Sequence, residues 1–233
     1  MISEAPPELV ADAIRRAGAG NPLLGIGTTG QRGQRGPMTT AAATDLVAAV
    51  GRWLGTGEAR VAASMVVLGY AARLVGPSVA VPLRDGILPD LGPARVEYSF
   101  QPDRGFQLTL PEPTGWQGDP ESLRRRWCEV VVDGHLAGVI DTVREVVPVA
   151  TGLLWGNVAS GLAGALKALA ASGAVPADRC HAEGLARLDH GPLRGSGRLD
   201  DRLRFVRRSC CLYYRLDGGG YCGDCPLPVH SGA

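Results

Sequence analysis

The chain has 233 residues, 45% of them hydrophobic, and a formal net charge of +1 at pH 7. This length can bury a substantial core in one large domain or two small ones. The near-zero charge gives no reason to expect nucleic acid or an anionic membrane as a partner. The segment Met1–Pro7 lacks the basic and apolar regions of a secretory signal. We therefore expect a cytoplasmic protein whose thiols stay reduced.

The first predicted region, residues 1–115, mixes helices and strands. Three segments have apolar residues at helical spacing and are predicted helices: 7–17, 40–54 and 58–74. A glycine- and proline-rich loop at 21–37 separates the first two. Three later segments are rich in β-branched and aromatic residues and are predicted strands: 79–83, 94–100 and 105–110. The turn at 101–104 predicts that the last two strands form an antiparallel hairpin.

The second predicted region, residues 116–200, is helical. Asp119–Glu121 is a typical helix start, with a capping carboxylate and a proline in the first turn. Helical spacing continues to about Val146, with a predicted break at Asp133–Gly134. Residues 147–166 carry no charge and are numerous enough to span a bilayer. Their many small and polar side chains favour a buried core helix, so we expect no stable membrane insertion. A further helix is predicted at 176–188.

The third predicted region, residues 201–233, contains four of the six cysteines. They form an adjacent pair followed, ten residues later, by a C-x-x-C motif: Cys210, Cys211, Cys222 and Cys225. Thiolates are soft ligands that select zinc, copper(I) or iron–sulfur clusters. Cysteines this dense in a chain without a secretory signal favour a metal site over a disulfide framework.

The adjacent pair bears on the choice of metal. Neighbouring side chains point in different directions, so two such thiolates reach a single tetrahedral zinc only with an awkward backbone. A two-iron cluster offers two separated metal centres. Structural zinc sites usually combine two C-x-x-C-like motifs, and this chain has one. The spacing favours a [2Fe–2S] cluster, with a structural zinc site and a disulfide as open alternatives.

Two stretches around these cysteines, Arg208–Arg215 (RSCCLYYR) and Tyr221–Leu227 (YCGDCPL), resemble the C-terminal signature of FhuF-like ferric-siderophore reductases. In that family all four cysteines bind a [2Fe–2S] cluster, so the resemblance implies that the four are ligands here. It also implies an iron–sulfur oxidoreductase that transfers one electron to siderophore-bound iron(III). The electron would come from a separate donor, such as a ferredoxin or a flavoprotein reductase. Residues 153–160 resemble, less specifically, the family's helix before the cluster region.

The overall prediction is an α+β protein, mostly helical. A small antiparallel sheet lies in the middle, and a C-terminal helical region ends in an iron–sulfur cluster loop. Two other functions stay open: an iron–sulfur electron-transfer module for a different acceptor, and a non-redox binding protein with a structural zinc site.

Two further motifs compete with this interpretation. Gly25–Gly30 fits the dinucleotide pattern G-x-G-x-x-G, but a helix-like segment and not a strand precedes it. His181–Glu183 with the C-x-x-C pair is similar to a zinc deaminase signature, but Tyr221 stands where that signature has proline. We therefore predict neither nucleotide binding nor deaminase activity.

The remaining candidate residues have simpler explanations. Cys128 and Cys180 lack partners at ligand spacing and are predicted core residues. Three histidines are scattered singly: His135, His190 and His230. Asn157 is either a satisfied buried amide or a hydrogen-bonding residue in a pocket. Residues 187–215 contain eight arginines against three aspartates, a net charge of +5. They form either a solvated face with internal ion pairs or a positive rim that guides an anionic chelate or an acidic partner.

Overall fold

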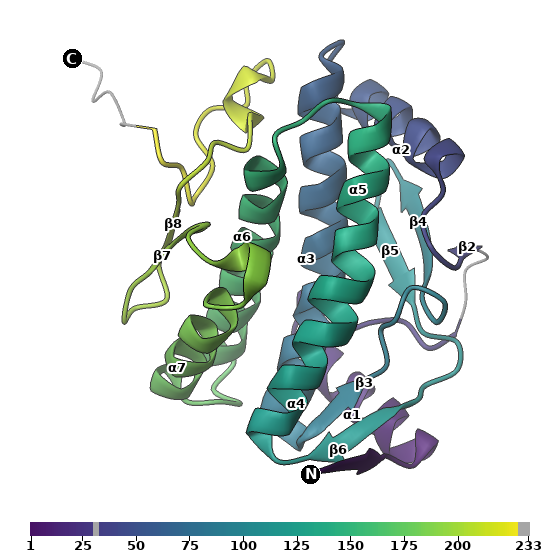
Figure 1. The fold of residues 1–233 in the computed structure, drawn as a ribbon, viewed down its shortest axis with the longest axis vertical. Coiled ribbons are helices and arrows are strands. Elements are labelled where there is room, and N and C mark those ends of the chain that lie inside the picture. Colours follow the sequence, from purple (N-terminus) through teal and green to yellow (C-terminus); the bar gives the residue numbers. More distant parts are fainter. Residues whose placement is uncertain (30–32, 228–233) are drawn as a thin grey trace.

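The computed structural model describes residues 1–29 and 33–227. Gly30 and His230, both considered in the sequence analysis, lie outside these residues. The fold is α+β and mostly helical, as predicted (Figure 1). One buried hydrophobic cluster contains residues of all three predicted regions, from Ala5 to Cys211. The division into regions at 1–115, 116–200 and 201–233 stays a prediction.

The helices of the described chain are α1 (Pro7–Gly18), α2 (Thr40–Leu54), α3 (Ala59–Asp85), α4 (Pro120–Trp127), α5 (Ala137–Val146), α6 (Thr151–Ala171) and α7 (Ala177–Leu188). A π-helical segment, Cys128–Leu136, joins α4 to α5. Short 3-10 turns occur at Pro22–Leu24, Gly191–Leu193 and Tyr213–Arg215. The predicted helix starts at Thr40 and after Asp119 are confirmed, and the Asp119 carboxylate caps α4 by accepting the Ser122 amide.

The strands are β1 (Ile2–Glu4), β2 (Gln34–Arg35), β3 (Ile87–Pro89), β4 (Glu97–Gln101), β5 (Gly105–Thr109), β6 (Gly115–Gly118), β7 (Gly197–Leu199) and β8 (Phe205–Arg207). They form three antiparallel sheets, in the orders β1-β6-β3, β2-β4-β5 and β7-β8. The predicted hairpin is confirmed as β4–β5, with Phe100 opposite Phe106. The sheet that pairs β1 and β3 with β6 was not predicted, because its strands are too short to show alternation.

Helices α3 and α6 lie side by side at the centre of the molecule (Figure 1). The missing side chain of Gly161 permits this close packing, since a Cβ there would lie 3.3 Å from the Ala72 backbone. Each helix is long and apolar enough to cross a bilayer, but 78% of each apolar window is buried in the rest of the chain. The interpretation of 147–166 as part of a buried core helix is confirmed.

The predicted strand at 79–83 is wrong, because these residues continue α3. The helix passes through Pro77 and Pro82, although each proline removes a backbone donor. Val79 and Val81 are fully buried on this helix. Tertiary burial therefore overrides the local preference of β-branched residues for strands.

The predicted helix break at Asp133–Gly134 is also wrong. The chain instead widens into the π-helical segment, where a Cβ on Gly134 would lie 3.1 Å from the Glu129 carbonyl oxygen. The segment directs His135 into the core, where its Nε2 lies 2.8 Å from the Tyr70 hydroxyl and its Nδ1 lies 2.6 Å from the Leu91 oxygen. The buried histidine therefore has partners on both ring nitrogens.

A short hairpin before the cysteine loop was not predicted. After α7 the chain forms the hairpin β7–β8, which packs on α6 and leads directly into the cysteine loop (Figure 1). The strands have three residues each, and their arginine-rich sequence lacks the apolar alternation that predicts a strand.

A glycine in α3 gives a test of how this helix packs against the 3-10 turn at Pro22–Leu24. A Cβ on Gly76 would lie 1.8 Å from the Leu23 carbonyl oxygen, so Gly76→Ala should lower the free energy of unfolding by about 2–3 kcal/mol. The matched control is Gly164→Ala, on an exposed face of α6 with nothing within 4 Å. It should raise that free energy by about 0.5–1 kcal/mol. Urea unfolding followed by circular dichroism measures both, and equal stability of the two variants would contradict this packing.

Candidate metal centre

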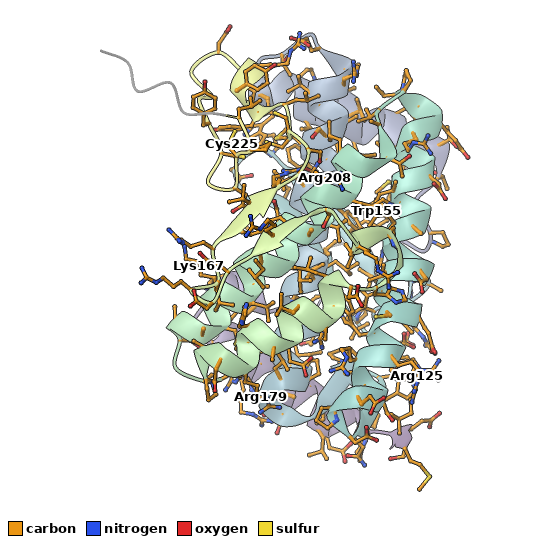
Figure 2. All side chains as sticks on the ribbon, turned by 60° about the vertical axis from the view of Figure 1, so that its left-hand side comes forward. Arg125, Trp155, Lys167, Arg179, Arg208 and Cys225 are labelled. Atoms are coloured by element: carbon orange, nitrogen blue, oxygen red, sulfur yellow. The ribbon has the colours of Figure 1, made fainter. Side chains whose placement is uncertain are left out.

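The cysteine loop, residues 208–227, begins at the end of β8 and returns beside it. The Arg207 amide donates to the Asp224 oxygen at 3.0 Å, so the C-x-x-C end of the loop lies next to the strand that leads into it. The Ser209 hydroxyl donates to the Gly152 oxygen at 3.0 Å, at the first turn of α6. Figure 2 shows this end of the molecule, with Cys225 and Arg208 labelled.

Two of the four predicted ligands lie close together in this loop. The thiols of Cys211 and Cys222 lie close enough to influence each other electrostatically. Cys211 is buried, whereas Cys210, Cys222 and Cys225 are partly exposed. Burial and the neighbouring Cys211 thiol raise the pKa of the Cys222 thiol. A thiol with a raised pKa is a poor nucleophile unless a cation stabilises the thiolate.

Backbone amides point at two of the sulfur atoms. Leu212 adopts a left-handed conformation, with φ of 69°, and its amide donates to the Cys210 sulfur at 3.3 Å. The Asp224 amide also faces the Cys222 sulfur and acts to lower the pKa of that thiol. Such hydrogen bonds stabilise negative charge on sulfur and tune the potential of iron–sulfur clusters.

The described residues do not show a completed metal cage. No group of three or more His, Cys, Asp and Glu side chains among them stands in a metal-binding arrangement. The structure brings Cys211 and Cys222 close together and places Cys210 and Cys225 in the same loop. The assignment of all four as ligands stays a prediction.

A buried chain of polar groups connects the loop to both central helices. The Ser64 hydroxyl, on α3, donates to the Cys211 oxygen at 2.7 Å. The side-chain amide of Asn157, on α6, donates to the Ser64 carbonyl oxygen at 2.8 Å and to its hydroxyl at 3.0 Å. The Asn157 amide oxygen accepts a hydrogen bond from the Arg207 guanidinium, which also donates to the Leu153 oxygen at 3.2 Å. Asn157 is therefore a satisfied buried amide, one of the two alternatives.

Arg207 is a buried cation that lacks a full set of partners among the described residues. Its residue is only 2% exposed, yet it forms no ion pair with a carboxylate in the described part of the chain. Its Nε has no hydrogen-bond partner there either. A buried cation is costly unless an anion compensates it. Four thiolates around a [2Fe–2S] cluster would carry a net negative charge beside this guanidinium, so the residues present fit that group.

The sequence of α6 makes room for this arginine. A Cβ on Gly156 would lie 2.6 Å from the Ser209 hydroxyl and 3.1 Å from an Arg207 guanidinium nitrogen. Gly156 belongs to the segment 153–160, singled out in the sequence analysis, and this segment also supplies Asn157 and the Leu153 oxygen. The helix thus offers Arg207 a notch and two acceptors. Sequence reasoning did not identify Ser64, because a serine inside an apolar helix has no distinctive pattern.

The other sequence candidates lie elsewhere. Cys128 and Cys180 are buried in the core, as predicted, and burial raises the pKa of the Cys128 thiol to about 11. His190 contacts Asp133 at 3.0 Å. The deaminase-like Glu183 forms ion pairs with Arg124 and Arg187. Gly25 follows a 3-10 turn and Gly27 bridges to β5, so the described part of the G-x-G-x-x-G motif lacks the strand that dinucleotide binding requires.

Comparison with known families identifies the loop. Residues 207–227 match a family model described as the FhuF 2Fe-2S C-terminal domain. A search of curated proteins finds no match for the chain. The resemblance drawn from the cysteine spacing is confirmed, and the loop is a 2Fe–2S cluster-binding domain.

The ligand assignment has a direct test. Alanine at any one of the four loop cysteines should lower the iron content or change the visible spectrum of the purified protein, because each removes a thiolate. Cys128→Ala and Cys180→Ala are the matched controls, and both should keep full iron content. A Cys211→Ala protein with an unchanged spectrum and unchanged iron content would show that the assignment is wrong.

Arg207 gives a second test. Arg207→Met removes the buried positive charge, so the midpoint potential should become more negative by on the order of 60 mV, a tenfold change in a one-electron equilibrium. Arg207→Lys keeps the charge and should shift the potential less. In the metal-free protein the methionine should cost less stability than in the loaded one, because no anion is then left uncompensated. Equal potentials of the wild type and the methionine variant would contradict charge compensation.

Proposed function

We propose that this protein is an iron–sulfur reductase that transfers one electron to iron(III) held by a siderophore and releases iron(II). The observation that carries the proposal is the partly exposed cysteine loop that matches the FhuF 2Fe-2S C-terminal domain. A [2Fe–2S] cluster bound there would supply one electron per turnover. The loop lies at one end of the molecule, where an acceptor can approach it (Figure 2).

The chemistry of release requires no acid or base from the protein. Siderophores hold iron(III) through hard oxygen donors, and iron(II) binds the same donors more weakly. One electron leaves the reduced protein and one iron(III) becomes iron(II); the organic chelator stays intact and its iron–oxygen bonds weaken. The residues of this chain have three tasks: to hold the electron carrier, to set its potential, and to bring the chelate close to it.

The proposal includes a separate electron donor, a ferredoxin or a flavoprotein reductase. The strand required before a dinucleotide-binding glycine motif is lacking at Gly25–Gly27 in the described chain. It also includes a cytoplasmic location, where thiols stay reduced and clusters can be assembled. The apolar windows of both central helices are mostly buried in the rest of the chain, which is compatible with a cytoplasmic location.

The test is a single-turnover reaction. Protein reduced with dithionite and freed of excess reductant should be reoxidised by one equivalent of a ferric siderophore, with iron(II) trapped by ferrozine. NADPH added to the oxidised protein alone should yield no iron(II), and addition of a donor protein should restore turnover.

Other outcomes would redirect the proposal. Reoxidation by dioxygen or a redox dye, but not by any ferric siderophore, would favour an electron-transfer module for another acceptor. Steady iron(II) production from NADPH by the pure protein would contradict the need for a donor.

A further inference from the structure

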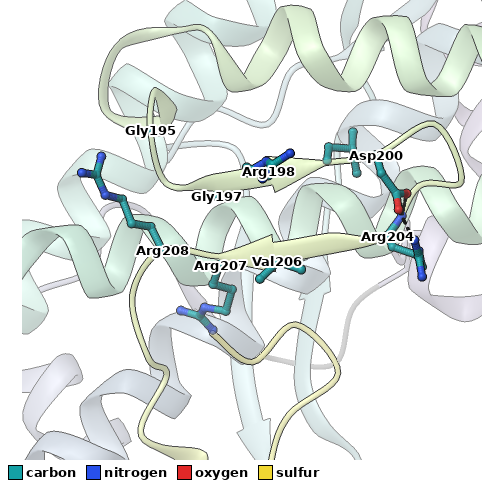
Figure 3. A pocket seen from close by; sticks show the side chains of 9 residues that line it. Gly195, Gly197, Arg198, Asp200, Arg204, Val206, Arg207 and Arg208 are labelled. Atoms are coloured by element: carbon teal, nitrogen blue, oxygen red, sulfur yellow. Dashed lines mark hydrogen bonds and ion pairs between the residues drawn. The ribbon is translucent and has the colours of Figure 1, made fainter. Parts of the chain in front are cut away.

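We infer that a pocket on the hairpin β7–β8, here called the arginine pocket, binds the anionic surface of an iron(III) chelate. The inference rests on the proposed function for the nature of the metal complex, and it adds the place and the charge of that complex. The pocket has a volume of about 720 Å³, and both strands of the hairpin line it (Figure 3). Small-molecule sites typically have volumes of this size.

The pocket carries excess positive charge. Four arginines line it, at positions 198, 204, 207 and 208, against a single acidic residue, Asp200. Asp200 is already engaged, because its carboxylate accepts the Arg204 guanidinium at 2.7 Å and two backbone amides. Arg198 and Arg208 form no ion pair within the described residues. Unpaired guanidinium groups around a concavity form a site for anions.

The sequence of the arginine-rich stretch, residues 187–215, is compatible with internal ion pairs or with a positive rim. The structure shows that some of these arginines are paired and others are not. Three exposed or partly exposed arginines pair internally: Arg194 with Asp189, Arg204 with Asp200, and Arg215 with Glu58. Arg187 pairs with Glu183 in the interior. Of the four arginines of this stretch without an ion pair among the described residues, three line the pocket (Arg198, Arg207 and Arg208) and Arg202 does not. Figure 3 shows Arg208 at one end of the hairpin and the Arg204–Asp200 pair at the other.

The wall of the pocket combines glycine backbone with exposed apolar surface. Gly195 and Gly197 line it without side chains. A Cβ on Gly197 would lie 2.3 Å from the Phe205 ring, so the hairpin requires glycine at this position. Val206 lines the same pocket and is 53% exposed. Apolar surface among cations suits an anion with an organic exterior better than a small hydrated ion.

The pocket is next to the cysteine loop. Arg208 lines the pocket and Cys210 follows two residues later. The Cα atoms of these two residues are therefore at most about 7 Å apart. Arg207 also lines the pocket while its guanidinium binds Asn157 inside the protein. A chelate seated on these arginines would therefore lie close to the electron carrier.

The same charge could serve to dock an acidic donor protein, but the shape favours a small ligand. A stable protein interface buries roughly 800 Å² per partner, whereas this site is a concavity of about 720 Å³ lined by nine residues. Steering by the arginines is screened over a Debye length of about 8 Å in physiological salt, so binding should weaken as salt is raised.

The experiment measures binding without electron transfer. Gallium(III) replaces iron(III) in an anionic tris-catecholate chelate and in a neutral tris-hydroxamate chelate, and calorimetry gives the affinity of each for the oxidised, cluster-loaded protein. The test variant is Arg198→Gln/Arg208→Gln. The matched control is Arg125→Gln/Arg179→Gln, which removes the same charge from two exposed arginines that Figure 2 shows at the opposite end from Cys225.

The test variant should bind the anionic chelate at least about tenfold more weakly at low salt, because two charge-assisted contacts are lost. The control should change that affinity less than about threefold, and the neutral chelate should respond weakly to both. The variant should keep its visible spectrum and its iron content, so loss of binding is separable from damage to the metal centre.

Three results would overturn the inference. The first is a wild type that does not bind the anionic gallium chelate. The second is an equal loss of chelate affinity in both double variants. The third is a test variant that keeps full chelate affinity and loses only its reduction by a donor protein, which would make the surface a donor site. None of these results tests whether the protein reduces the iron(III) chelate. If the gallium chelate binds as expected and the iron chelate is not reduced, the proposed function fails and the anion site remains.

Discussion

A guanidinium buried without a carboxylate partner is the constraint on which this structure depends. Arg207 leaves β8, enters a notch at Gly156 and donates to Leu153 and Asn157 on α6. A charge in such a place is unfavourable unless an anion lies nearby. A [2Fe–2S] cluster held by the thiolates of the cysteine loop would supply that anion. The folding of the loop, the binding of the metal and the placement of this arginine therefore all depend on the same compensation of charge.

The polar chain from Arg207 through Asn157 and Ser64 to the Cys211 oxygen extends this constraint to the rest of the fold. It connects the loop to α3 and α6, the two helices at the centre of the hydrophobic core. Apart from the Arg207 Nε, the side chains of this polar chain have hydrogen-bond partners, and satisfied polar networks fix a single geometry. Such a rigid support fits an electron carrier, whose potential depends on hydrogen bonds and charges held at fixed positions.

The sequence predicted the chemistry better than the architecture. The cysteine motif favoured a [2Fe–2S] cluster and its resemblance to a known family identified the cluster domain, because such a motif lies within a short segment. Helix starts at Thr40 and Asp119 were also local, since capping depends on a few neighbouring residues. The failures came from long-range packing: 79–83 became helix because the core buries its valines, and the hairpin β7–β8 forms where no apolar alternation exists. Nothing in the sequence distinguishes buried Arg207 from exposed Arg208, because their environments are set by α6.

The central claim is that the loop holds a [2Fe–2S] cluster whose charge Arg207 compensates. Metal and sulfide analysis of the purified protein, combined with electron paramagnetic resonance after reduction by dithionite, tests it most directly. The account predicts a reddish-brown protein with iron and acid-labile sulfide in equal amounts, bleached on reduction, with a signal from a single unpaired electron. A colourless protein that contains zinc and no sulfide would contradict it.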